Sequence, residues 1–263
     1  MKKELFMIFG DPVSHSKSPL MHNYSFQELG FGGCYSRYHL KDGTQLKEKI
    51  LSLKIKGCNI TVPHKEEAYR ACDVLDNFAK SVGVVNTIIQ KGGKLYGYNT
   101  DALGFLKAVE GFDAKRVLFL GAGGTAKSTA KILKESGVDI TISNRSKGRL
   151  EGFAQDGFET FTYDELDSKD FDLVVNMTSA GLSDDSLPAP ENLIRELFEN
   201  AKGAVDVIYK ETPFLRLAKE YHLPTEDGSS MLIYQGAIAF EYFTEHQFGF
   251  DEIAPLMREA LNL

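Results

Sequence analysis

Two ionisable side chains, Lys65 and Asp101, stand where an enzyme could use them to move a proton. Each comes just after a predicted strand, in the first turn of a predicted helix, and α/β sheets open their ligand crevices at such strand ends. An ammonium lies at the unfavourable end of the helix dipole there, which suggests a task in proton transfer. The competing interpretation is a surface lysine beside Glu66 and Glu67, with Asp101 only stabilising its helix.

A glycine-rich turn after an apolar run predicts a binding site for phosphate groups. Residues 117–128 read VLFLGAGGTAKS, which matches the GxGxxG/A dinucleotide fingerprint. Gly121 would permit the tight turn, Gly123 a close approach of backbone to a pyrophosphate, and Ala126 close packing of helix on strand. An ordinary Gly-rich turn is the alternative, but a second predicted strand at 138–143 completes the βαβ unit.

The residues after that second strand indicate which dinucleotide would bind. The chain continues Asn144-Arg145-Ser146-Lys147-Gly148-Arg149, with three cations and without the acid that NAD sites usually carry. Cations in a first helical turn oppose the helix dipole unless an anion binds there. A solvated basic helix start is the alternative. We therefore expect NADP, with its 2′-phosphate near Arg145.

Polar residues at other strand ends are candidates for contacts to a small ligand. Ser16 and Ser18 follow the predicted strand 5–10 and could receive a carboxylate, although Ser18 before Pro19 also reads as a helix cap. The further candidates are polar residues in or beside apolar runs that need hydrogen-bond partners, from the protein or from a ligand. They are Asn59 and Thr61 on one face of strand 58–62, Asn86 in strand 84–90, Tyr209 at the end of strand 203–209, and Gln235 in a predicted helix 229–247.

These residues need an α/β scaffold to position them. Predicted strands alternate with helices, which indicates a parallel sheet, and the segments 84–90 and 94–98 form a hairpin over Gly92-Gly93. Further strands are expected at 34–40 and 171–176, and helices at 20–29, 44–53, from about 64, from about 99 and at 193–198. The helix that begins near residue 99 leads into the glycine-rich unit, so the domain junction is placed there.

Composition limits the function classes. With 263 residues the chain can form two modest domains, and its net charge of −7 argues against a nucleic-acid or anionic-membrane binder. No apolar run approaches the ~18–20 residues of a membrane span, and a cytoplasmic protein is expected. The three cysteines lack a CxxC pattern and the six histidines are scattered, so neither disulfides nor a metal are predicted.

Taken together, the motifs resemble the shikimate dehydrogenases in order and approximate spacing, over nearly the whole chain. The matching segments are Ser16-Lys17-Ser18-Pro19, Asn59-Ile60-Thr61-Val62-Pro63-His64-Lys65, Val85-Asn86-Thr87, Asn99-Thr100-Asp101, Gly121-Ala122-Gly123-Gly124, Asn144-Arg145-Ser146 and Gln235-Gly236. The resemblance implies NADP-dependent, reversible reduction of 3-dehydroshikimate to shikimate, in chorismate and aromatic amino-acid biosynthesis.

The resemblance also implies an architecture of two domains with a cleft between them. An N-terminal α/β substrate domain would comprise residues 1–100 plus about 236–263, and a Rossmann-like NADP-binding domain residues 101–235. The family occurs as monomers and dimers, so a homodimer is among the expected states.

Roles follow by matching motif. Lys65 and Asp101 resemble the catalytic pair, and the implied substrate contacts are Ser16, Ser18, Asn59, Thr61, Lys65, Asn86, Asp101, Tyr209 and Gln235. The implied cofactor contacts are Gly121, Ala122, Gly123, Gly124, Thr125, Ala126, Asn144, Arg145, Ser146, Arg149, Thr178 and Gly228. The run Gly228-Ser229-Ser230-Met231 departs from the family's usual Gly-Leu-Gly-Met.

Two rival functions remain open at this point. One is a quinate/shikimate dehydrogenase that accepts NAD, which the basic cluster at Arg145 disfavours. The other is a non-catalytic dinucleotide or metabolite sensor, which would have no use for a proton donor such as Lys65.

Overall fold

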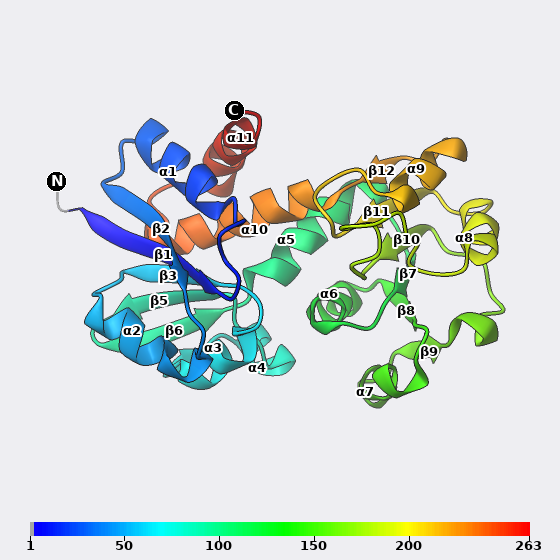
Figure 1. Ribbon diagram of the computed structural model, residues 1–263, viewed down its shortest axis with the longest axis horizontal. Coiled ribbons are helices and arrows are strands. Elements are labelled where there is room, and N and C mark those ends of the chain that lie inside the picture. Colours follow the sequence, from blue (N-terminus) through cyan, green and yellow to red (C-terminus); the bar gives the residue numbers. More distant parts are fainter. Residues whose placement is uncertain (1–2) are drawn as a thin grey trace. The chain divides into compact units, whose positions relative to one another are not determined.

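The computed structural model describes residues 3–263 and divides into two compact units (Figure 1). Unit 1 extends to Gly104 and also includes Ile233–Leu263, while unit 2 is Phe105–Leu232. The chain passes from one unit to the other inside two helices, α5 (Thr100–Val109) and α10 (Gly228–Phe243).

Unit 1 is built on a six-stranded mixed sheet with the order β2-β1-β3-β5-β6-β4. Strand β1 pairs in parallel with β2 and β3, as the strand–helix alternation predicts, and β5 pairs antiparallel with β3 and β6. Gly92 (φ 59°) and Gly93 (φ 78°) form the predicted hairpin turn in the left-handed region. The strands are β1 (Glu4–Gly10), β2 (Gly33–His39), β3 (Gly57–Ile60), β4 (Val74–Leu75), β5 (Thr87–Lys91) and β6 (Lys94–Tyr98).

Helices cover both faces of this sheet. On one face, Phe6 of β1 contacts the rings of Phe26 in α1 and Phe243 in α10. On the other face, Phe9 belongs to a buried cluster with residues of α2, α3 and α4. The remaining helices of unit 1 are α1 (Ser18–Glu28), α2 (Leu46–Ser52), α3 (Lys65–Ala71), α4 (Asn77–Val82) and α11 (Phe250–Leu261).

Unit 2 contains an entirely parallel sheet with the order β12-β11-β10-β7-β8-β9. Numbered from β7, this is the 6-5-4-1-2-3 arrangement of a Rossmann fold, whose strand order reverses between β7 and β10. The strands are β7 (Arg116–Leu120), β8 (Asp139–Ser143), β9 (Glu159–Phe161), β10 (Leu173–Asn176), β11 (Gly203–Asp206) and β12 (Thr225–Glu226). The helices are α6 (Gly124–Glu135), α7 (Glu151–Gln155), α8 (Glu191–Phe198) and α9 (Pro213–Glu220).

Several predicted boundaries are wrong. The strand expected at 203–209 ends at Asp206, because that side chain accepts the amide hydrogen of Ile208 and turns the chain. The helix expected at 229–247 ends at Phe243, and Glu245 (φ 51°) and His246 (φ 60°) follow in the left-handed region. Helix α11 was not predicted, and neither were the short strands β4, β9 and β12.

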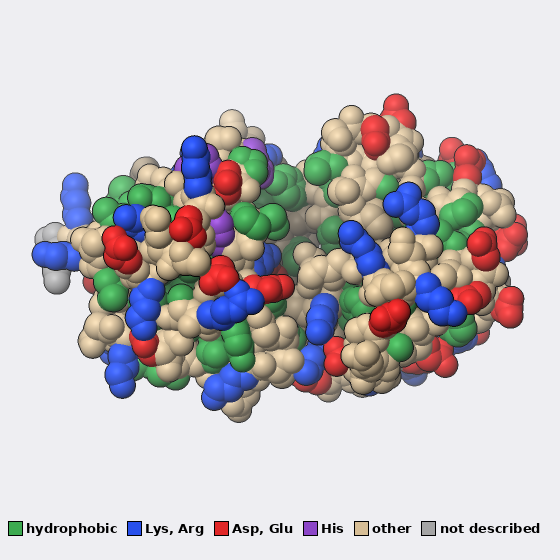
Figure 2. All heavy atoms as spheres, turned by 60° about the horizontal axis from the view of Figure 1, so that its bottom comes forward, with side chains coloured by type: hydrophobic (Ala, Val, Ile, Leu, Met, Phe, Trp, Pro, Cys, Tyr) green, Lys and Arg blue, Asp and Glu red, His purple; other side chains and the backbone are tan. Residues whose placement is uncertain are grey.

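The surface carries charges of both signs. On the face drawn in Figure 2, basic and acidic side chains are interspersed, with apolar side chains scattered between them. Within residues 3–263, no helix combines the length and apolar character needed to cross a bilayer, and no cluster of three metal-ligating side chains occurs. Cys34, Cys58 and Cys72 are free thiols.

Candidate active site

Lys65 and Asp101 form an ion pair in unit 1. The Lys65 Nζ lies 2.6 Å from the Asp101 Oδ2, and both side chains are largely shielded from solvent. Lys65 is the first residue of α3, and Asp101 stands in the first turn of α5, whose N-terminus is capped by the Asn99 side chain through the amide of Ala102. The two helices therefore bring an ammonium and a carboxylate into direct contact, an arrangement in which the carboxylate could orient a proton donor.

A chain of buried neutral side chains lies beside this pair. Asn59 Nδ2 donates to the Thr87 hydroxyl at 3.0 Å, and Asn86 Nδ2 donates to the Thr100 hydroxyl at 3.0 Å. Asn86 Oδ1 in turn accepts from the Thr100 amide at 2.7 Å. Asn86 Nδ2 also reaches the Gln235 Oε1 at 3.5 Å. These bonds within the protein fix the orientation of three predicted substrate contacts, Asn59, Asn86 and Gln235.

Tyr35 extends the network toward the serine loop. Its hydroxyl donates to Asn59 Oδ1 at 2.7 Å and hydrogen-bonds the Ser18 side chain. Burial raises the pKa of Tyr35 well above its usual value, so the phenol stays a hydrogen-bond donor. Its ring stacks on the buried imidazole of His22 with centroids 4.3 Å apart.

Ser18 does not cap helix α1 as predicted. The helix already includes Ser18 as its first residue, and the Ser16 hydroxyl accepts the Ser18 amide hydrogen at 3.3 Å. The Ser16 carbonyl receives two hydrogen bonds from the Arg37 guanidinium, at 3.1 and 2.5 Å. The serine loop is therefore held from strand β2, and the capping alternative does not account for Ser18.

Thr61 lies just beyond the end of β3 rather than within the strand. Its amide donates to the Phe9 carbonyl at 2.9 Å, and its carbonyl accepts the amide hydrogen of His64. These backbone bonds place Thr61 in the turn that leads to Lys65. Unit 1 thus contains Ser16, Ser18, Asn59, Thr61, Lys65, Asn86, Asp101 and Gln235, while Tyr209 belongs to unit 2.

The glycine-rich turn of unit 2 has the conformation that the fingerprint predicts. Gly121 has φ +117°, and a Cβ there would lie 2.6 Å from the Thr178 Cγ2, so both strain and space require glycine. A Cβ on Gly123 or Gly124 would meet no atom within 4 Å, so the backbone beside the α6 N-terminus is open. No side chain caps Gly123, and these amides are available to an anion such as a pyrophosphate.

The basic segment after β8 is exposed. Arg145 and Arg149 make no ion pair with any residue of the described range 3–263, whereas Lys147 lies 3.6 Å from Glu165. Asn144 is fixed by a hydrogen bond from its Nδ2 to the Ser146 carbonyl at 3.1 Å. Two guanidinium groups at the end of this strand fit the 2′-phosphate of NADP.

Three further predicted residues of unit 2 lie in loops or at a helix start. The amide and hydroxyl of Thr178 both donate to Asn176 Oδ1, at 2.9 and 2.7 Å. Tyr209 is 43% exposed and lies in the loop after β11. A Cβ on Gly228 would lie 2.2 Å from the Val207 carbonyl oxygen, so glycine is required at the start of α10 whatever residues follow it.

The sequence did not single out three members of the unit 1 network. Thr87 and Thr100 are each fully buried, and both stand within motifs that carry other candidates, so their polar character was an available signal. Tyr35 gave no such signal, because an aromatic residue in a strand is ordinary.

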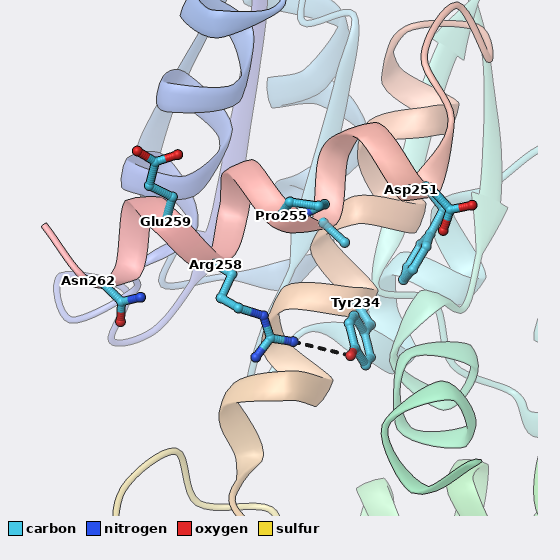
Figure 3. A pocket seen from close by; sticks show the side chains of 8 residues that line it. Tyr234, Asp251, Pro255, Arg258, Glu259 and Asn262 are labelled. Atoms are coloured by element: carbon cyan, nitrogen blue, oxygen red, sulfur yellow. Dashed lines mark hydrogen bonds between the residues drawn. The ribbon is translucent and has the colours of Figure 1, made fainter. Parts of the chain in front are cut away.

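A surface pocket of about 490 Å³ lies between α10 and α11 and contains none of the predicted site residues (Figure 3). Arg258 donates to the Tyr234 hydroxyl at 3.2 Å across it, as the dashed line in Figure 3 marks.

Comparisons with known proteins agree with this geometry. Residues 8–88 match the family model described as "Shikimate dehydrogenase substrate binding domain", and residues 105–183 match "Shikimate / quinate 5-dehydrogenase". A protein of Helicobacter hepaticus named "Shikimate dehydrogenase (NADP(+))" is 42% identical over 264 residues, covering 97% of this chain and 98% of the relative.

Solved structures lead to the same family. Shikimate dehydrogenase of Aquifex aeolicus superposes with a TM-score of 0.86 at 34% identity, covering 97% of this chain and 98% of that one. Shikimate 5-dehydrogenase of Thermus thermophilus, solved in complex with NADP(H) and shikimate, has a TM-score of 0.86 at 32% identity, covering 98% and 99%. This chain belongs to the shikimate dehydrogenase family.

Proposed function

We propose that this chain catalyses the NADP-dependent, reversible reduction of 3-dehydroshikimate to shikimate, in chorismate and aromatic amino-acid biosynthesis. The observation that carries the proposal is the 2.6 Å contact between Lys65 Nζ and Asp101 Oδ2 beside a preformed polar network. A relative that is 42% identical over nearly the full length of this chain is named for this activity.

Substrate contacts are proposed in two groups. The Ser16 and Ser18 hydroxyls, with the Tyr209 phenol, take the carboxylate of the substrate. The ring hydroxyls are taken by Asn59, Thr61, Asn86, Asp101 and Gln235, together with Lys65. Buried amides and hydroxyls with fixed orientation discriminate strongly between ligands, because a ligand that lacks a hydroxyl leaves them unpaired.

The cofactor contacts are proposed in unit 2. The backbone of Gly121, Ala122, Gly123, Gly124, Thr125 and Ala126 takes the pyrophosphate, and Asn144, Arg145, Ser146 and Arg149 take the adenosine 2′-phosphate. Thr178 and Gly228 contact the nicotinamide portion. When bound, NADPH supplies the hydride that reduces the substrate carbonyl.

Lys65 supplies the proton. Negative charge develops on the carbonyl oxygen as it is reduced, and the Lys65 ammonium stabilises that charge and donates a proton to the oxygen. Asp101 holds the Lys65 side chain in place through their ion pair. In the reverse direction, Lys65 accepts the proton of the shikimate hydroxyl.

The finer assignments are part of the same proposal. The substrate-binding domain, expected at residues 1–100 and about 236–263, is assigned to unit 1 and so includes Asp101 and Gln235, and the dinucleotide-binding domain, expected at residues 101–235, is assigned to unit 2. We further propose a cytoplasmic enzyme that can form a homodimer, which cell fractionation and sedimentation velocity test directly.

The function is tested by following reduction of the dinucleotide at a fixed enzyme concentration. Shikimate and quinate are each tested with NADP and with NAD. Turnover with shikimate and NADP is the expected result. Preferred turnover of quinate with NAD would replace the proposal by the quinate/shikimate alternative. Dinucleotide binding without turnover of any pair would favour the sensor.

A further inference from the structure

Asp206 is a buried carboxylate that the proposed reaction does not use. It ends strand β11 and is fully buried. Its Oδ2 accepts from Asn176 Nδ2 and from the Thr212 hydroxyl, each at 2.8 Å, and its Oδ1 accepts from the Ile208 amide at 2.9 Å. No cation pairs with it anywhere in residues 3–263.

A buried carboxylate without a cation is expensive for a fold to keep. Burial raises the pKa of Asp206, and the hydrogen bonds from Ile208, Asn176 and Thr212 oppose that shift. All three groups donate to it, so both oxygens act as acceptors. An apolar residue would fill this interior position at less cost, which points to a role for the acceptor geometry.

The three donors connect Asp206 to two loops with proposed ligand contacts. Through Asn176 it reaches Thr178, whose amide and hydroxyl both donate to Asn176 Oδ1. Through Ile208 and Thr212 it fixes the chain on both sides of Tyr209. One carboxylate therefore ties together the loops that follow β10 and β11.

We propose that Asp206 is a positioning residue, which holds the Tyr209 phenol for the substrate carboxylate and Thr178 for the nicotinamide portion of the cofactor. The proposal rests on the proposed function. Asp206 acts through its neighbours and contacts neither ligand itself.

The decisive experiment compares Thr212→Val with Thr212→Ser, each in the wild-type background and combined with Tyr209→Phe. Valine removes the hydroxyl that donates to Asp206, and serine restores it. We expect Thr212→Val to raise the KM for shikimate about three- to tenfold, because a change of that size corresponds to the loss of one hydrogen bond. The change in kcat should be smaller. Thr212→Ser rescues the KM.

The double variants separate positioning from general weakening. Thr212 also caps helix α9 through the Leu215 amide, so loss of its hydroxyl destabilises the helix as well. If Thr212 acts through Tyr209, the Thr212→Val change raises the KM less than about twofold once the phenol is gone. Fold changes that multiply in the double variant would overturn the proposal, as would an unchanged KM in Thr212→Val or Tyr209→Phe.

Asp206→Asn tests both loops together. The amide nitrogen cannot accept a hydrogen bond. At the Oδ1 position it would face the Ile208 amide, and at the Oδ2 position the Asn176 amide and the Thr212 hydroxyl. The loop that carries Tyr209 therefore loses a contact in either orientation, and we expect the KM for shikimate to rise while the unfolding midpoint confirms a folded protein. Unchanged constants for both ligands in the folded variant would overturn the proposal. If Asp206→Asn does not fold, the comparison of Thr212→Val with Thr212→Ser tests the proposal. A wild type that does not oxidise shikimate overturns the proposed function first, before any variant is compared.

Discussion

The two units prepare their sites in opposite ways. In unit 1 the proposed substrate contacts are side chains that already hydrogen-bond one another, as Asn86 does with Thr100 and Gln235. In unit 2 the proposed cofactor contacts are open backbone at Gly123 and exposed guanidinium groups such as Arg145. Recognition of a small polyol depends on fixed side-chain orientation, whereas recognition of a dinucleotide depends on backbone conformation and charge.

Two buried ionisable residues, Asp206 in unit 2 and His22 in unit 1, show the opposite contrast. Unit 2 keeps the carboxylate of Asp206 buried with three donors. Unit 1 keeps the imidazole of His22 fully buried among aromatic rings, and neither ring nitrogen has a hydrogen-bond partner in the described structure. The carboxylate organises loops, while the imidazole serves packing.

Removal of the proton donor has the largest expected effect. Lys65→Ala should lower kcat by about 10²–10⁴, the usual contribution of a positioned acid or base. NADPH affinity should be unchanged, since all proposed cofactor contacts lie in unit 2. Steady-state kinetics and a fluorescence titration with NADPH measure the two quantities. Lys80→Ala, an exposed lysine of the same unit, is the control, and normal turnover in Lys65→Ala would refute the assigned role.

The buried imidazole should make unit 1 sensitive to acid. Burial lowers the pKa of His22 from 6.5 to about 3 in the folded state. Protons therefore favour the unfolded chain, so stability is complete above pH 6.5 and falls as the pH drops from 6.5 toward 3, by on the order of 3–5 kcal/mol.

His22→Phe should remove this loss, because a phenyl ring suits the surrounding aromatic cluster and binds no proton. Urea unfolding midpoints between pH 4 and 8 measure the change. His15→Phe, at an exposed position, should keep the wild-type profile. Parallel profiles for wild type and His22→Phe would contradict the prediction.

The substrate network should contribute to stability as well as binding. Thr87→Val leaves the Asn59 amide without its buried hydroxyl partner, which should lower the free energy of unfolding by about 1–3 kcal/mol and raise the KM for shikimate. Urea titration and kinetics check both effects. Thr44→Val repeats the substitution at an exposed threonine and should change stability by less than about 0.5 kcal/mol. Equal effects at the two positions would mean that the buried network of unit 1 contributes no more to stability than an exposed threonine does.

Loss of a guanidinium in unit 2 should affect the cofactor alone. Arg145→Ala should raise the KM for NADP about tenfold, because a charge-assisted contact to the 2′-phosphate is lost. The KM values for NAD and for shikimate should not change. Arg195→Ala, at a half-buried arginine of α8 that pairs with Glu191 and Glu220, serves as the control for the general loss of a guanidinium in unit 2. An equal rise with NAD would mean that Arg145 does not read the 2′-phosphate.

Much of the architecture could be predicted from the sequence because it depends on local chemistry. The glycines at 121 and 123, the apolar runs of the strands and the hairpin at Gly92-Gly93 each predict their conformation from neighbouring residues. Predicted strand boundaries were wrong where a side-chain contact redirects the backbone. At Asp206 the side chain accepts the Ile208 amide hydrogen, so the strand ends three residues before Tyr209.

The sequence by itself determined the family, the fold class and the types of residue available for chemistry, because these are recorded in short motifs and in hydrophobic periodicity. Only the tertiary structure decided which partners those residues have. Lys65 and Asp101 are 36 positions apart, and Asn86 and Gln235 are 149 apart, yet each pair is in contact. Such pairings follow from how sheets and helices pack, and packing depends on the whole chain at once.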